Sequence, residues 1–368
     1  MRGLANAARR VIVMPAMNSL HLIERFHAAR AKQETLVLVT VYATQGSTYS
    51  KAGARMLITE GGESQGLISG GCLEGDLAMR AAAARAANAA AVVSYDLRDE
   101  ADELFGLAVG CKGVIDVLLQ PVSAAGAYEP LASIAEALMG NSPGGLAVVI
   151  GSAEPGLAAG ATLVLAGGTT RAFGVPEPWQ SRLADGARAA ARGRSAQTET
   201  AGEGTRLLYA PLMPIPRVLI LGAGLDAVPL VNVLAELGWR VVIADHRPAY
   251  LERPGFARAE RRQTVKAAVL GRELALGDYD AIVVMSHHLP TDRTYLGQLA
   301  AVDVPYLGLL GPPARRQRLL DELGPAAGTL AERLRGPVGL DIGADSAESI
   351  ALSIAAEMQL VLASVPND

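Results

Sequence analysis

The chain has little cysteine, few aromatic residues and no surplus of positive charge. Its 368 residues include 2 cysteines and 4% aromatics, and the formal net charge is −4. Two cysteines are too few for a disulfide scaffold, and their spacing matches no paired zinc-ligand pattern, so we expect no metal site of that kind and a reduced, cytoplasmic setting. The acidic balance, without a basic stripe, argues against nucleic acid as a partner.

The sequence also lacks a long uninterrupted apolar run. The longest apolar region, residues 146–168, contains Glu154, Pro155 and several glycines. It therefore predicts two strands joined by a loop and no membrane span. The N-terminal residues have a basic start and a short apolar stretch, but Pro15 breaks that stretch and an amphipathic pattern follows, which argues against a secretory signal.

The length predicts two domains, because single hydrophobic cores rarely grow beyond about 250–300 residues. Crowded prolines at 211, 214 and 216 place the boundary between residues 213 and 214. For domain 1–213 we expect an α+β fold, and we interpret the polar stretch 186–204 as a surface loop or mobile insertion. The patterns predict helices near 18–32 and after Cys72, and strands at 36–46, 55–62, 91–97, 113–121, 146–152, 161–167 and 206–212.

Domain 214–368 alternates strands and helices from Arg217 onward. Its strands are continuous apolar runs, typical of a parallel sheet that is buried on both faces. The fold class is therefore α/β, with an N-terminal α+β domain followed by a Rossmann-like domain built on a doubly wound parallel sheet.

Both cysteines lie in glycine-rich runs, Cys72 after Gly70 and Gly71, and Cys111 before Lys112. A packing cysteine usually sits among large apolar residues instead. The helix expected after Cys72 places the sulfur near a positive helix end, and Lys112 adds a cation beside Cys111; both features favour a thiolate. We take Cys72 and Cys111 as candidate catalytic thiols.

Lys51 and Arg55 form a small cationic pair next to glycines. Such a pair suits an anionic ligand. The alternative is an ordinary solvated loop, which is the commoner case when this segment is considered alone.

A dinucleotide-binding fingerprint in its G-x-G-x-x-A form begins domain 214–368. Gly222 permits the tight turn, and Gly224 lets a phosphate approach the start of a helix. Asp245 ends the next strand, where an acidic side chain bonds ribose hydroxyls, and Arg247 suits a 2′-phosphate or another anion. The alternative is a Rossmann scaffold whose nucleotide site is repurposed or empty.

His287 and His288 end the strand that begins near residue 279, at the sheet edge where ligands of such folds bind. One of them would serve as an acid, a base or a metal ligand. The alternative is a histidine that only bonds a strand-end carbonyl. Asp345 or Ser346 is expected to cap the final helix.

Six ordered motifs together carry a resemblance, and they are residues 46–59, 66–77, 110–121, 221–231, 244–250 and 336–343. In these motifs the chain resembles the XdhC/CoxI family of accessory factors for xanthine and carbon monoxide dehydrogenases. The resemblance implies a chaperone that binds the molybdenum cofactor (molybdopterin), acts with a cysteine desulfurase in its sulfuration, and delivers it to an apo-molybdoenzyme. It also implies a homodimer. Cys72 and Cys111 match the family's glycine-cysteine motifs, and we favour Cys72.

Three hypotheses follow. The first is a cofactor-binding maturation chaperone that is not itself an enzyme. The second is an NAD(P)-dependent oxidoreductase that uses the Rossmann-like domain. The third is a regulatory nucleotide-binding module without chemistry. The sequence has no obvious partner for hydride transfer, which favours the first hypothesis over the second.

Overall fold

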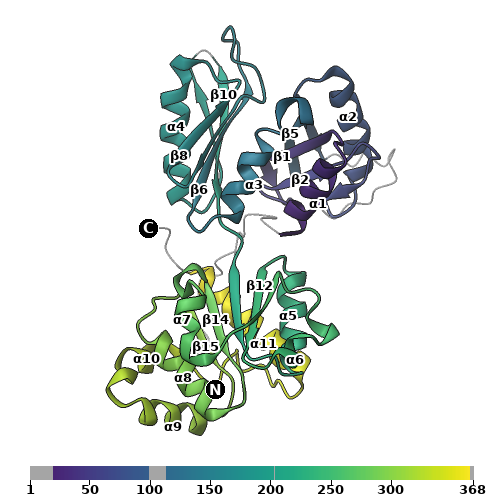
Figure 1. Cartoon of the computed structure of the whole chain (residues 1–368). Helices are drawn as coiled ribbons and strands as arrows, with labels where there is room; N and C mark the ends of the chain where they lie inside the picture. The colour runs from purple at the N-terminus through teal and green to yellow at the C-terminus, as the bar shows by residue number, and fades with distance from the viewer. Residues whose placement is uncertain (1–19, 99–112, 203, 365–368) are drawn as a thin grey trace. The chain divides into compact units, whose positions relative to one another are not determined.

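The computed structural model describes residues 20–98, 113–202 and 204–364. The chain divides into two compact units, the first ending at Pro214 and the second beginning at Ile215 (Figure 1). The boundary predicted from the crowded prolines is one residue earlier, between residues 213 and 214.

The first half of the N-terminal unit is a five-stranded antiparallel sheet in the order β3-β2-β1-β5-β4. Helix α2 covers one face of this sheet, where Leu77 and Ala81 pack against Val39 and Met56 of the strands. The elements are α1 (Leu20–Ala31), β1 (Leu36–Gly46), β2 (Arg55–Ile58), β3 (Ser64–Gln65), α2 (Glu74–Ala87), β4 (Ala91–Asp96) and β5 (Gly113–Val122). The predicted strand at 36–46 is confirmed, and the strand predicted at 55–62 ends earlier, at Ile58.

The second half is another five-stranded antiparallel sheet, in the order β8-β7-β6-β10-β9. Helix α4 packs on one face, with Leu183 and Ala187 against Ala147 and Leu163. The elements are η2 (Ala124–Gly126), α3 (Leu131–Met139), β6 (Gly144–Gly151), β7 (Thr162–Ala166), β8 (Thr169–Phe173), α4 (Glu177–Arg192), β9 (Gln197–Ala201) and β10 (Thr205–Leu212).

The interpretation of residues 186–204 as a surface loop or mobile insertion is wrong. This stretch contains the last turns of α4 and the edge strand β9, which pairs with β10. The pattern misled because all the β9 residues except the last are polar and exposed, so the strand has no apolar alternation to reveal it.

The two sheets of this unit contact each other. The Gln120 side chain of β5 donates from Nε2 to the Gly160 carbonyl oxygen at 2.8 Å. Gly53, just before β2, faces the other sheet as well, because a Cβ added there would lie 3.1 Å from the Cβ of Ala196. Ala54 and Met56 point into the core beneath α2, so Arg55 lies on the opposite face of the strand.

The C-terminal unit is a six-stranded sheet in the order β13-β12-β11-β14-β15-β16, with every neighbouring pair parallel. Separate apolar clusters cover its two faces, with α5 and α11 on one and α8 and α9 on the other (Figure 1). This is the expected doubly wound α/β fold. Ser346 caps α11 as expected, in a reciprocal capping box with Ser349.

The longer elements of this unit are β11 (Arg217–Leu221), α5 (Ala227–Glu236), β12 (Arg240–Asp245), β13 (Arg261–Thr264), β14 (Ala281–Val284), α8 (Leu289–Leu299), β15 (Tyr306–Leu309), α9 (Pro313–Leu323) and α11 (Ala347–Leu362). The short ones are α6 (Pro248–Leu251), η3 (Pro254–Phe256), η4 (Ala267–Val269), α7 (Leu270–Glu273), η5 (Leu276–Asp278), η6 (Gly324–Ala327), α10 (Gly328–Arg333) and β16 (Leu334–Arg335). Across the described ranges, no helix is both long and apolar enough to cross a bilayer.

The close packing of α4 on β6 predicts how a substitution at Gly145 changes the free energy of unfolding. A Cβ at Gly145 would lie 1.9 Å from the Ala187 carbonyl oxygen, whereas a Cβ at Gly75 in α2 would meet nothing within 4 Å. We expect Gly145→Ala to lower the free energy of unfolding by about 1–3 kcal/mol through overpacking. Gly75→Ala is the control and should be neutral or stabilising by up to about 1 kcal/mol. Urea denaturation measures both, and equal effects of the two substitutions would contradict the packing.

Candidate functional site

Cys72 lies in a glycine loop, residues 66–73, that leads into α2. Gly70 and Gly71 have φ values of +80° and +107°, in the region that favours glycine. Cys72 itself is partly exposed and is a free thiol. The loop therefore presents the sulfur next to bare backbone, as the sequence predicts.

The carboxylate of Glu74 holds this loop in place. It accepts hydrogen bonds from the backbone amides of Ile68, Ser69 and Leu73 at 3.1, 3.0 and 3.1 Å, and from the Ser69 hydroxyl at 2.6 Å. Burial acts to raise the pKa of Glu74, but the Ser69 hydroxyl and the amides outweigh it and hold the pKa below its usual value. The negative charge that the amides of the glycine loop bind is therefore the carboxylate of Glu74, a side chain of this protein.

The local charges differ from those expected around Cys72. Glu74 and Asp76 both occupy the first turn of α2, so two carboxylates offset the positive helix end that was expected to favour a thiolate. The role of Cys72 stays a prediction.

The loop that carries Lys51, residues 47–53, contacts the glycine loop. The Ser50 hydroxyl donates to the Leu67 carbonyl oxygen at 3.3 Å, and a Cβ at Gly70 would lie 3.5 Å from the Tyr49 ring. The first residue of β5, Gly113, also lies against this loop, since a Cβ there would be 2.6 Å from Cγ2 of Thr48. Cys111 lies outside the described residues. Lys51, the glycines and Cys72 thus gather at one end of the sheet.

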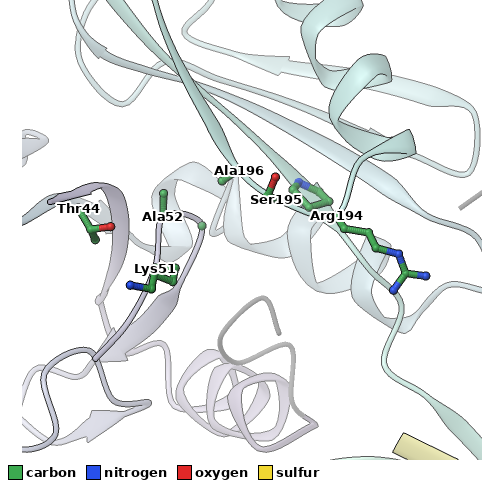
Figure 2. Close-up of a pocket in the computed structure, with 8 residues that line it drawn as sticks. Thr44, Lys51, Ala52, Arg194, Ser195 and Ala196 are labelled. Carbon is green, nitrogen blue, oxygen red and sulfur yellow. The ribbon is translucent and has the colours of Figure 1, made fainter. Parts of the chain in front are cut away.

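Lys51 also borders a pocket between the two sheets, with a volume of about 220 Å³. We call it the inter-sheet pocket. Thr44, Lys51 and Gly53 line it from one sheet, and Arg194, Ser195 and Ala196 from the segment before β9 (Figure 2). Arg194 and Ser195 were missed at the sequence level because they lie in the stretch interpreted as a surface loop.

Arg55, the first residue of β2, is buried. Only 3% of its surface is exposed, and within the described part of the chain its Nε and Nη2 atoms have no hydrogen-bond partner. Burial lowers the pKa of this guanidinium to about 10. Arg55 therefore cannot contact a ligand from a solvated loop, although its charge still suits an anion.

In the C-terminal unit, the glycines of the fingerprint make the expected turn from β11 into α5. Gly222 has a φ of +125°, and a Cβ there would lie 2.6 Å from the backbone of Met285 in the adjacent segment. Only glycine fits this position. The backbone of the Rossmann turn therefore forms as its sequence predicts.

A carboxylate occupies the approach to Gly224. A Cβ on Gly224 would lie 2.3 Å from Oδ1 of Asp226, so the Asp226 carboxylate covers the side from which a diphosphate approaches the second glycine. Its other oxygen lies 2.7 Å from Nε2 of His287. His287 is largely exposed and has a φ of +61°, which is rare for a residue with a side chain. His287 is thus at the predicted sheet edge, paired with a residue that sequence reasoning did not single out.

Asp245 is fully buried, and both of its oxygens are bonded. It accepts from the Ala223 amide at 2.8 Å and from the backbone, Nε and Nη2 of Arg247, each at 2.9 Å. Burial acts to raise the pKa of Asp245, but the bonds from Arg247 and Ala223 lower it overall. Arg247 and Arg253 also both lie over the Tyr250 ring, with guanidinium carbons 3.7 and 4.0 Å from its centre. The predicted ribose contact of Asp245 would require Arg247 to move.

Comparison with known proteins identifies the family. The family model described as the XdhC Rossmann domain matches residues 218–358, and that of the XdhC and CoxI family matches residues 29–96. A protein of Bacillus subtilis (strain 168), named as a probable subunit of xanthine dehydrogenase, is 32% identical over 329 residues, which cover 89% of this chain and 93% of that protein. The chain belongs to the XdhC and CoxI family.

Two further proteins are similar to the chain. A crystal structure from Bacillus halodurans, described as a xanthine dehydrogenase, is 28% identical and superposes with a TM-score of 0.75 over 94% of this chain and 98% of that one. The uncharacterized protein YqeB of Escherichia coli (strain K12) is 29% identical over 158 residues, which are 41% of this chain and 28% of that protein. The first resemblance covers the same α+β and Rossmann-like arrangement.

The candidate residues divide between the two family matches. Lys51, Arg55, Gly70, Gly71 and Cys72 fall in the region matched as XdhC and CoxI. The Rossmann candidates, Gly222, Gly224, Asp245, Arg247 and His287, fall in the other. Cys111 falls in neither. The match covers the segments that carry these candidates, and their roles stay predictions.

The hydrogen bonds to Glu74 predict that removing its carboxylate destabilises the glycine loop. Glu74→Ala leaves up to four donors without their acceptor, so we expect the free energy of unfolding to fall by about 1–3 kcal/mol and amide exchange at residues 68–73 to accelerate. Because the pKa of Glu74 is lowered in the folded protein, this stabilisation is present at neutral pH and is lost as the pH falls through that lowered value.

The control is Glu177→Ala, since Glu177 also lies in the first turn of a helix, α4, but follows a proline instead of a glycine loop. Urea titrations from pH 7 to pH 3 with hydrogen-exchange mass spectrometry measure both variants. Unchanged exchange at residues 68–73 in Glu74→Ala would refute the anchoring role.

The position of the Asp226 carboxylate predicts that it weakens nucleotide binding at the Rossmann turn. Asp226→Asn removes a negative charge from beside the phosphate position, and repulsion at such short range is worth at least about 1 kcal/mol. We therefore expect Asp226→Asn to bind ADP or NAD⁺ about tenfold more tightly than the wild type, as measured by isothermal titration calorimetry. Asp321→Asn, on the exposed side of α9, is the control. Equal affinities in Asp226→Asn and the wild type would show that the carboxylate does not block the site.

Proposed function

We propose that this protein is a maturation factor that binds the molybdenum cofactor as its cargo and supplies it to a xanthine dehydrogenase-type molybdoenzyme. The observation that carries this proposal is the resemblance over nearly the full length of the Bacillus subtilis protein, whose name assigns it to a xanthine dehydrogenase. A relative whose name refers to xanthine dehydrogenase is consistent with a role for this protein in assisting such an enzyme.

The residues at the N-terminal site fit such a cargo by their donor chemistry. The cofactor is a polyanionic pterin that carries a phosphate and a metal-bound dithiolene. A Cβ at Gly71 would meet nothing within 4 Å, so this glycine leaves the backbone open to a ligand. Lys51 supplies positive charge, and the Cys72 thiol is a soft donor suited to a sulfur-bound metal. The orphaned, buried guanidinium of Arg55 supports an anionic ligand nearby.

Each residue then has a limited task. Lys51 would attract and orient the anionic cargo, the glycine loop would contact it through backbone amides, and Cys72 would hold its sulfur-rich end until transfer. Among the residues that the structure describes, no group of three or more side chains is arranged to hold a metal ion by itself, so the metal would be held by the cargo's own sulfurs.

Partners follow from the same proposal. A cysteine desulfurase would supply the terminal sulfido ligand while the cargo is bound, and the apo-molybdoenzyme would receive it. We also propose a homodimer, acting in the cytoplasm.

An NAD(P)-dependent oxidoreductase is the second candidate, and the His287–Asp226 pair at the sheet edge is the observation that favours it. Two features weigh against it. Asp226 lies where a diphosphate would approach Gly224, and Arg247 engages Asp245 where a ribose would bind. A regulatory nucleotide module faces the same two obstacles.

The proposal is tested by the cargo itself. Protein expressed in a host that makes the cofactor should co-purify with molybdenum and pterin at close to one equivalent. Cys72→Ala should lose at least tenfold of the bound molybdenum, measured by mass spectrometry of the metal, and should fail to activate an apo-xanthine dehydrogenase.

Cys111→Ala is the matched comparison, because we favour Cys72 of the two thiols, and it should retain more of both properties. A folded Cys72→Ala variant that carries and delivers molybdenum as well as the wild type would rule out the proposed role of Cys72. Stoichiometric nicotinamide without molybdenum would replace the proposal with the oxidoreductase.

A further inference from the structure

The C-terminal unit exposes large apolar side chains on two neighbouring helices. Leu225 and Leu237 flank α5, and Leu352 and Leu360 lie on α11, with exposed fractions between 47% and 72%. The two helices pack against each other and cover the same face of the sheet (Figure 1). A single exposed leucine needs no explanation, but a group of them on adjacent helices marks a surface for a partner.

The apolar residues of this surface follow a regular spacing of four. Residues four apart lie on one side of a helix and form a ridge, which packs into the groove of a facing helix. The buried side of α11 consists of other residues, such as Ile354 and Met358, so the exposed row faces away from the sheet. We call the two rows the apolar ridges, and they are Leu352, Ala356 and Leu360 on α11, and Leu225, Pro229, Val233 and Leu237 along α5 and its two ends.

Neither apolar ridge contains a charged residue. The charged residues of α5 and α11 are three glutamates. Glu357 is buried and bonded within the unit, and Glu236 is paired with Arg258. Glu348 lies in the first turn of α11, at the end of its ridge. A surface whose centre is apolar and whose charges lie at the edge has the composition of an interface.

The placement of these charges favours a second copy of the chain as the partner. A partner with a charged surface would bury its charges against ridges that offer none of the opposite sign, which is costly. A second copy brings the same uncharged ridges. If two α11 helices cross in antiparallel directions at Ala356, Leu352 of each copy lies against Leu360 of the other, and the two Glu348 carboxylates lie at opposite ends. A parallel crossing would bring these two carboxylates together.

From the two apolar ridges we propose that α5 and α11 form the contact surface of a homodimer with twofold symmetry, in which the α11 helices of the two copies pack antiparallel. In such an interface the same patch of each copy meets the other, so every contact occurs twice. Ala356 at the crossing has a small side chain, which lets the two helices approach closely. This inference rests on the homodimer of the proposed function and not on its cargo.

The first experiment measures the dissociation constant of the dimer by sedimentation velocity of the full chain over a range of concentrations. We expect the wild type to be dimeric. Leu352→Glu and Leu360→Glu each place two charges per dimer in the apolar centre, so each should raise the dissociation constant at least tenfold. Met79→Glu is the control, because Met79 is 67% exposed but lies on α2 of the N-terminal unit, and it should leave the constant unchanged.

The second experiment tests the antiparallel arrangement with charges of opposite sign. In a chain that carries both Leu352→Glu and Leu360→Lys, each glutamate lies against a lysine of the other copy. We therefore expect this variant to dimerise at least tenfold more tightly than the variant with Leu352→Glu and Leu360→Glu, and the gain should shrink as salt is added. Recovery of the dimer would also show that chains substituted at these exposed positions fold.

The outcomes separate the interface from the proposed function. A monomeric wild type would overturn the proposal and leave the apolar ridges to a different protein or to another segment of this chain. A dimer that survives Leu352→Glu and Leu360→Glu would overturn the interface while leaving the homodimer. Equal dissociation of the opposite-charge and like-charge variants would overturn the antiparallel arrangement. Molybdenum measured in the same samples is independent, since a wild-type dimer that carries none would refute the cargo and leave the interface.

Discussion

Free amides at the start of a helix favour negative charge, and in the described part of the chain two helices that follow glycine-rich turns have one of the chain's own carboxylates beside that start. Glu74 accepts up to four hydrogen bonds from the loop that carries Cys72, and Asp226 lies against Gly224 at the beginning of α5. Glycine loops of this kind bind external anions in many proteins. Here an external anion must either displace a carboxylate or bind beside it, and that constraint governs every assignment of function to these loops.

Arg55 presents the opposite situation. The helix starts have internal anions, but this buried guanidinium has none among the described residues. An isolated buried charge is costly, so the N-terminal unit has to offset the cost of burying Arg55.

The sequence predicts the framework well, and the reason is that strands and turns depend on local signals. The strand at 36–46, the helix after Cys72 and the Rossmann turn all follow from apolar runs and glycines, and all are confirmed. Strand β9 was not predictable in the same way, because four of its five residues are polar and it is defined by pairing with β10. The His287–Asp226 pair joins residues 61 positions apart, a separation that no local pattern reports.

The burial of Arg55 could not be read from the sequence either, since an arginine next to glycines looks like part of a solvated loop. Its burial is a property of the folded N-terminal unit, in which only 3% of its surface is exposed. The loop 47–53, just before it in the chain, touches the glycine loop through Ser50 and borders the inter-sheet pocket through Lys51. One short loop therefore connects the segment that carries Cys72 with a second, separate feature of the same unit.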